Sequence, residues 1–154
     1  MNLPREIEEA CAPLFAALPM EEAMGRLLGS HPKQTELVEA ALRHPALAER
    51  PELAAGLWLY VDDLERSHAI SQGITDATGS YWHGIMHRRE GDFSNSHYWL
   101  RQTRSHPLRA EYPELDPDAL VDKVAAAKGA DTPELVAQQR AEWVALFAWC
   151  AETP

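Results

Sequence analysis

The sequence TGSYWHGIMHRREGDFSN, which spans Thr78–Asn95, predicts two helices joined by a tight turn. Asp76 offers a side-chain oxygen to cap a first helix that runs from about Gly79 to Glu90. The pair Gly91–Asp92 is typical of a turn, and a second helix is expected over 94–104. Consecutive helices with so short a connection must be neighbours in space, so this central hairpin indicates the fold class.

The rest of the chain repeats the helical pattern. Apolar residues recur at helical spacing along nearly all of the sequence, and no stretch alternates polar and apolar residues for the length of a strand. We therefore predict an all-α, single-domain bundle of about six to eight helices over residues 1–154, with the hairpin in its middle. Besides the hairpin, helices or helix starts are expected at 4–18, 20–28, 30–43, 51–70, Asp116 and Thr132.

Composition limits the class of protein. A chain of 154 residues with 45% hydrophobic content can bury one core without disulfides. The two cysteines, Cys11 and Cys150, lack a Cys-x-x-Cys spacing and are expected to be buried thiols, with a disulfide as the alternative. No apolar stretch approaches the roughly 20 residues of a membrane span, and the first residues lack a signal-peptide pattern. A cytoplasmic protein without a membrane partner is therefore expected.

Charge is distributed unevenly along the chain. The net charge of −10 argues against a nucleic-acid partner, because phosphate binding needs a positive surface. Residues 61–110 contain six Lys and Arg against six Asp and Glu, whereas residues 1–60 contain five against nine and residues 111–154 three against nine. The neutral centre also holds five of the seven histidines, so we expect a binding site or a buried polar network there.

His68 is the first candidate site residue in this centre. At about 100° per residue it continues the apolar stripe of Leu57 and Leu64, and therefore points inward in the expected helix 51–70. Glu65 precedes it by three residues, and a Glu-x-x-His pair can bring two ligands to one metal. The alternative is a core histidine bonded to a backbone carbonyl, with Glu65 in solvent.

A second polar row lies in the first helix of the hairpin. His83, His87 and Glu90 are spaced by four and three residues and share the face opposite the apolar face that includes Trp82. Two imidazoles and a carboxylate on one face can bind one cation. Gly84 stands where a zinc protease helix has glutamate, so that enzyme class is disfavoured. The alternative is a pair of histidines on a solvated face.

Arg89 is an exception to the amphipathic pattern of this helix. It projects into the middle of the apolar face, where an unpaired guanidinium would be costly to desolvate. A carboxylate from Asp62, Asp63 or Glu65 would make a structural ion pair with it. The alternative partner is an anionic ligand.

The central motif, continued by Tyr98-Trp99 and His106-Pro107, resembles the signature of a family of uncharacterised bacterial proteins. The stretch from Glu142 to Phe147 is similar to the last helix of that family, so the resemblance covers most of the chain. It implies no particular activity. It directs attention to His68, Gln72, His83, His87, Arg88, Arg89, Glu90, Asp92, Asn95 and Trp99.

The same region resembles one tetratricopeptide-type helical hairpin. Gly84, Gly91, Ser96 and Leu100 fall where such a repeat has two glycines, a small residue and a large apolar residue. Two aromatic positions of the pattern are not matched and no further copy follows, whereas a solenoid needs about three stacked units. We therefore expect the local hairpin geometry and not a repeat protein.

These features together predict a polar cleft that binds or acts on a small anionic molecule. Six residues are assigned to the chemistry, with the arginines neutralising substrate charge: His68, His83, His87, Glu90, Arg88 and Arg89. Ligand-binding roles are expected for Gln72, Trp82, Asp92, Asn95 and Trp99. A zinc or iron ion would activate water or substrate, held by His83 and His87 with Glu65, His68 or Glu90.

Two alternatives stay open. His68 faces the core side of its helix whereas His83 and His87 oppose theirs, so the three rings meet only if more protein covers the second helix. Otherwise His68 acts alone as an acid or base. The rival function is a non-catalytic helical scaffold that binds a protein segment in the hairpin groove. Its anchors would be Tyr98, Trp82 and Trp99.

Overall fold

The computed structural model describes residues 1–153, where the secondary structure is entirely helical. Nine α-helices and one 3-10 helix occur there and no strand does, so the all-α prediction is confirmed. Within the same residues, no helix combines a membrane-spanning length with sufficient apolar character. The elements are α1 (Arg5–Ala17), α2 (Thr35–Ala41), α3 (Pro51–Tyr60), α4 (Leu64–Ser71), α5 (Ala77–Glu90), α6 (Phe93–Leu100), η1 (Arg101–Thr103), α7 (Pro107–Glu111), α8 (Pro117–Ala126) and α9 (Pro133–Glu152).

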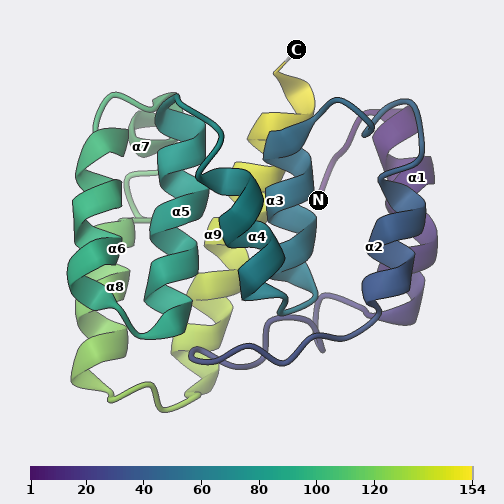
Figure 1. Ribbon diagram of the computed structural model, residues 1–154. Helices are drawn as coiled ribbons and strands as arrows, with labels where there is room; N and C mark the ends of the chain where they lie inside the picture. The colour runs from purple at the N-terminus through teal and green to yellow at the C-terminus, as the bar shows by residue number, and fades with distance from the viewer. Residues whose placement is uncertain (154) are drawn as a thin grey trace.

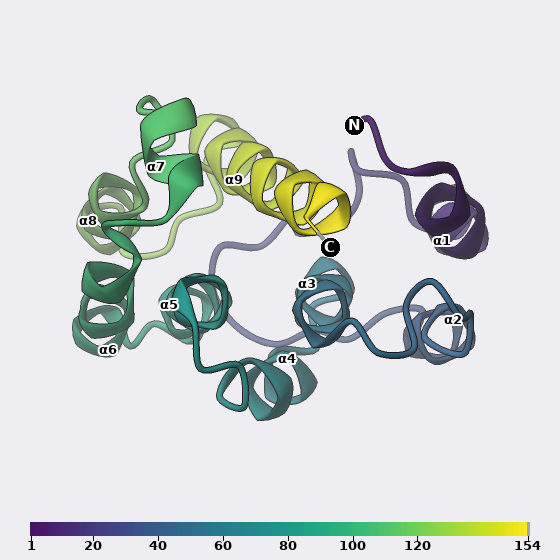
Figure 2. The ribbon, with the colours of Figure 1, turned by 90° about the horizontal axis from the view of Figure 1, so that it is seen from above.

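The helix α5 lies inside the bundle. Figure 1 and Figure 2 show α6 on one side of it and α4 on another, and α3 packs against both α5 and α9. The pair α1 and α2 lies at one end of the molecule, whereas α7 and α8 lie at the other end beside α6 and α9 (Figure 2). Residues 78–89 of α5 are buried without interruption, because neighbouring elements cover every face of the helix.

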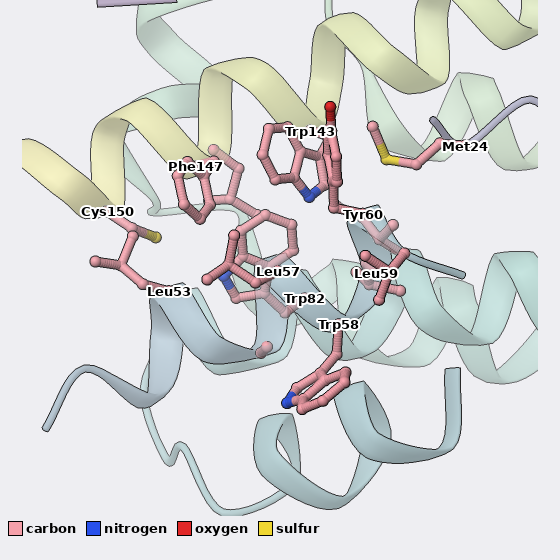
Figure 3. Close-up of a cluster of buried hydrophobic side chains, with 14 of the residues drawn as sticks. Met24, Leu53, Leu57, Trp58, Leu59, Tyr60, Trp82, Trp143, Phe147 and Cys150 are labelled. Carbon is pink, nitrogen blue, oxygen red and sulfur yellow. The ribbon is translucent and has the colours of Figure 1, made fainter. Parts of the chain in front are cut away.

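The hydrophobic core forms where α3, α5 and α9 meet (Figure 3). Trp143 of α9 stacks on Phe147 with 4.6 Å between ring centroids, and its indole N–H donates to the Gly56 carbonyl of α3 at 2.8 Å. Gly56 permits this approach, since a Cβ there would lie 2.9 Å from both Phe147 and Trp82. Trp82 is itself fully buried, so this core fixes the position of α5.

The expected long helix over 51–70 is wrong, because the chain breaks between α3 and α4. Asp62 adopts a left-handed backbone conformation with φ of 62°. Asp63 then caps α4 by accepting a hydrogen bond from the Arg66 amide at 3.1 Å. The side chain of Asp62 pairs with Arg89 of α5, a long-range contact that helical periodicity does not reveal.

The helix expected over 20–28 is also wrong, since this segment forms turns and irregular backbone. Several of its carbonyls accept hydrogen bonds from distant side chains: Gln139 of α9 donates to the carbonyls of Met24 and Arg26, both at 3.0 Å. The short helix α7, which the sequence did not predict, begins at Pro107. The break after α3 and this extra helix account for the larger number of helices.

Two buried ion pairs tie α5 to the rest of the bundle. Arg88 donates to Glu142 of α9 at 2.7 Å, and Arg89 donates to Asp62 at 2.5 Å and to the Leu59 carbonyl at 2.9 Å. The exposed fractions of the two arginine side chains are 0% and 1%. The expected structural ion pair between Arg89 and a carboxylate of the preceding helical region is therefore confirmed.

Replacing Asp62 by asparagine is expected to lower the free energy of unfolding by about 3 kcal/mol, because Arg89 would stay buried without a countercharge. Asparagine keeps the side-chain size and tolerates a left-handed backbone. The loss of stability therefore measures the contribution of the carboxylate charge. Urea denaturation measures the change. The matched control is Asp63→Asn, which preserves a capping side chain and should cost less than about 1 kcal/mol. Equal losses in the two variants would contradict the role given to the buried pair.

Candidate metal centre

Three histidines from two helices meet at one face of α5, and we call them the histidine cluster: His68 of α4, and His83 and His87 of α5. One ring nitrogen from each lies within 4.8 Å of the other two. The ring centroids of His83 and His87 are 4.7 Å apart. The centroid of His68 lies 4.8 Å from that of His83 and 5.3 Å from that of His87. The three rings therefore lie together, which the sequence predicted only if more protein covered the histidine face of the helix.

The rings meet because α4 and α6 both cover the histidine face of α5. The close approach of α6 depends on Gly84, where a Cβ would lie only 2.6 Å from Leu100. The Ser96 hydroxyl also donates to the Gly84 carbonyl at 2.7 Å. This face of α5 is thus internal and not solvated, and the exposed fractions of His83 and His87 are 3% and 6%. The small residues at 84 and 96 were the sequence signal for this contact.

His87 is held at both ring nitrogens. Its Nδ1 lies 3.0 Å from Oε2 of Glu90, and its Nε2 lies 3.1 Å from the side-chain amide nitrogen of Asn95 in α6. When Nδ1 carries the proton and donates to Glu90, the Nε2 lone pair accepts from Asn95. A carboxylate on the far nitrogen is the usual device that orients a metal-binding histidine and raises its basicity. Glu90 is therefore suited to position His87.

His83 is a neutral ring with a free nitrogen. Its Nδ1 is buried and has no hydrogen-bond partner within residues 1–153. Trp99 of α6 stacks on it, with ring centroids 4.2 Å apart and planes inclined by 10°. Burial, and then the neighbouring His87 and His68, lowers the pKa of His83 from 6.5 to about 4. The ring is uncharged at neutral pH, which is the form of imidazole that binds a metal.

The outer side of the histidine cluster is formed by half-buried residues. His68 itself is half-buried, as are Asn95 and Trp99, two of the residues predicted to bind a ligand. Asp92 supports this side from the start of α6, where its carboxylate accepts from the Asn95 amide at 3.1 Å. The cluster therefore lies just beneath the surface, between α4 and α6.

Other predicted site residues are either engaged elsewhere or exposed. Arg88 and Arg89 are engaged in the buried ion pairs with α9 and the α3–α4 junction. Trp82 belongs to the core. Glu65 and Gln72 are exposed, one near the start of α4 and the other just after its end. The structure thus brings together the imidazoles, Glu90, Asn95 and Trp99, and separates the arginines from them.

The arrangement supplies three imidazole nitrogens from two helices. Zinc binds imidazole at about 2.0–2.1 Å, so the three nitrogens would have to approach to roughly 3.4 Å from one another around an ion. Side-chain rotation can close this distance, because the hydrogen bonds of His87 go to side chains and no ring of the cluster is bonded to the backbone of residues 1–153. The histidine cluster can therefore hold a metal ion.

Comparison of the chain with models of protein families, with curated proteins and with solved structures finds no match. The chemistry of the histidine cluster therefore rests on its own residues and their geometry. The fold around it contributes burial and orientation.

Acid is expected to destabilise the fold through His83. Its pKa is about 4 in the folded protein against 6.5 ordinarily, so unfolding takes up a proton between these values and the free energy of unfolding falls as the pH drops from 6.5 to 4. Denaturant titrations with a chelator present should show a shallower fall for His83→Phe. The control His31→Gln, at an exposed histidine, should keep the parent slope. An unchanged slope in His83→Phe would rule out a neutral, buried His83.

Proposed function

We propose that this protein binds a divalent metal ion, with zinc preferred, at the histidine cluster. The observation that carries the proposal is the convergence of three imidazoles with nitrogens within 4.8 Å, one of them buried, neutral and without a partner. A buried polar group without a partner costs roughly 1–3 kcal/mol, which coordination would recover. Three protein nitrogens and one open position form the ligand pattern of catalytic zinc sites.

The donor set favours zinc over iron. Iron(II) oxygenase sites use two histidines and a carboxylate ligand. Here Glu90 is engaged with Nδ1 of His87, and Glu65 is exposed. Thiolates do not compete as ligands, because burial raises the pKa of both Cys11 and Cys150 to about 12 and they lie on α1 and α9. Zinc held by neutral imidazoles is the best fit to these residues.

The proposed activity is a metal-assisted reaction on a small anionic substrate. Neutral imidazoles leave the charge of a divalent ion uncompensated, so the centre attracts an anion without help from Arg88 or Arg89. A bound zinc ion would supply a Lewis acid and lower the pKa of a bound water to about 7. Asn95 and Trp99 line the side from which substrate would approach, and Glu90 keeps His87 oriented.

We also propose that α5 and α6 form a tetratricopeptide-like hairpin in a member of the bacterial family whose signature the central motif resembles. The contact of Gly84 with Leu100 and the hydrogen bond from Ser96 support the hairpin geometry. In this proposal the hairpin does not stack with further copies. It presses Asn95 and Trp99 onto the metal-binding face of α5.

The rival function, a scaffold that binds a protein segment in the hairpin groove, has weaker support. Of its three expected anchors, Trp82 is 0% exposed and Trp99 is stacked on His83. Tyr98 remains, with 52% of its surface exposed. Interface energy is concentrated in a few well-packed anchors, and one open tyrosine does not make such a cluster.

Protein prepared without an affinity tag is expected to bind about one zinc ion per chain, and the double variant His83→Ala, His87→Ala to bind none, because two of the three nitrogen ligands are removed. Elemental analysis after dialysis against zinc and removal of the excess measures the stoichiometry. Cobalt(II) in place of zinc should give the visible spectrum of a four-coordinate ion in the parent protein only.

The matched control is His31→Ala, His44→Ala, which removes two imidazoles outside the histidine cluster and should keep the metal. Zinc should also raise the thermal midpoint of the parent and of the control, because a ligand that binds the native state stabilises it. Metal well below one equivalent in the parent, or equal metal in both double variants, would overturn the proposed centre.

Glu90→Gln is expected to weaken zinc binding by about 10–100-fold, since it removes the carboxylate that orients His87. Glu90 is exposed, so the fold should be unaffected. Competition with a chromophoric chelator measures the affinity. Glu65→Gln is the comparison variant and should bind zinc as the parent does. A loss confined to Glu65→Gln would show that Glu65, and not Glu90, serves the metal.

A further inference from the structure

The helix α9 presents an apolar surface on two sides. Its inner side carries core residues such as Trp143 and Phe147. A second stripe, at positions 141, 144, 145, 148 and 149, follows the i, i+3, i+4, i+7 spacing of one helix face. Four members of the stripe are only half-buried: Val144, Ala145, Ala148 and Trp149. A helix that is apolar on both sides is normally covered on both.

The residues around α7 form a wall opposite this stripe. Leu108, Tyr112 and Leu115 line the same hollow as the stripe, and its volume is about 470 Å³. Figure 2 shows α7 beside α9, at the end of the molecule where α6 and α8 lie. Trp149 also lines the hollow, and its ring packs against His106 with 4.3 Å between the ring centroids. We call this hollow the α7–α9 groove.

The rim of the α7–α9 groove is acidic. Glu111, Glu114 and Glu152 line it, and among residues 1–153 no lysine or arginine does. The surrounding segment 111–154 is acidic as well, with three Lys and Arg against nine Asp and Glu. An apolar floor with carboxylates along its edges complements an apolar ligand stripe flanked by cations.

We propose that the α7–α9 groove binds a basic amphipathic α-helix of a partner protein. Its apolar side chains would lie on the stripe of α9, and its Lys or Arg residues would meet the glutamates of the rim. The length is suitable, because α9 advances roughly 16 Å between Ala141 and Glu152, about three helical turns. Amphipathic helices occupy apolar grooves through anchors at i, i+3 or i+4, and i+7. Trp149 and Tyr112 are the aromatic side chains that would contribute most to binding.

A second copy of this chain fits the groove poorly. In a two-fold pairing the same patch meets itself, so the glutamates of both rims would face one another. Like charges across an interface oppose association, and nucleic acid is disfavoured by the same carboxylates. The groove also shares no residue with the histidine cluster, so the two proposals stand or fall separately.

The test uses a labelled synthetic helix of about 14 residues, with leucine at i, i+3, i+4 and i+7 and lysine on the other faces, titrated with the full chain by fluorescence anisotropy. Saturable one-to-one binding is expected. Ala148→Arg should weaken it at least about tenfold, because a cation would fill the floor of the groove. Arginine is a good helix former at this half-buried position, and circular dichroism verifies the fold.

Two controls separate the groove from general acidity. Glu111→Lys, Glu152→Lys should weaken binding about tenfold, whereas Glu8→Lys, Glu22→Lys changes the net charge equally at exposed positions elsewhere and should keep the affinity within about twofold. A peptide of the same composition with scattered leucines should not saturate. The proposal is overturned by absence of saturable binding, by equal binding of the scattered peptide, by equal losses in both charge variants, or by a dimer that Ala148→Arg dissociates.

Discussion

The two buried ion pairs of α5 are the constraint on which the rest of the structure depends. Arg88 reaches Glu142 of α9, and Arg89 reaches Asp62 at the break between α3 and α4. All four side chains are buried, and a charge left there without its partner would cost several kcal/mol. Pairing both arginines with a carboxylate at once sets the rotation of α5 about its own axis. That rotation turns its histidine face toward α4 and α6.

The histidine cluster contributes little to this stability. Its three rings are polar, one nitrogen of His83 has no partner within residues 1–153, and burial together with its neighbours lowers the pKa of that ring to about 4. A buried polar cluster that is incompletely bonded is costly, and strongly shifted pKa values gather at functional sites. Glu90, Asn95 and Trp99 nevertheless orient the rings, which is the property expected of a metal centre and not of a packing core.

Local signals in the sequence were sufficient for the helical class and for the hairpin. Asp76 caps α5 as predicted and Gly91 ends it with a positive φ of 86°, whereas α6 begins one residue earlier than expected and is capped by Asp92. Local signals failed at Asp62 and at the segment 20–28. There, side chains of α5 and α9 that are distant in sequence bond to the Asp62 carboxylate and to the Met24 carbonyl. Helical periodicity does not reveal such contacts. It therefore predicted one helix over 51–70 that breaks at Asp62, and a helix over 20–28 that does not form.

The sequence by itself determined that the protein is helical and that His83, His87 and Glu90 share one face of a helix, because caps and residue spacing act within a few turns. It also predicted that Arg89, which falls on the apolar face of the helix, pairs with a carboxylate. Only the tertiary structure decided that His68 joins that face and that Arg88 and Arg89 are instead engaged in buried ion pairs. These outcomes depend on which helices pack together, and packing is set by contacts among α3, α4, α5, α6 and α9 that no single segment encodes.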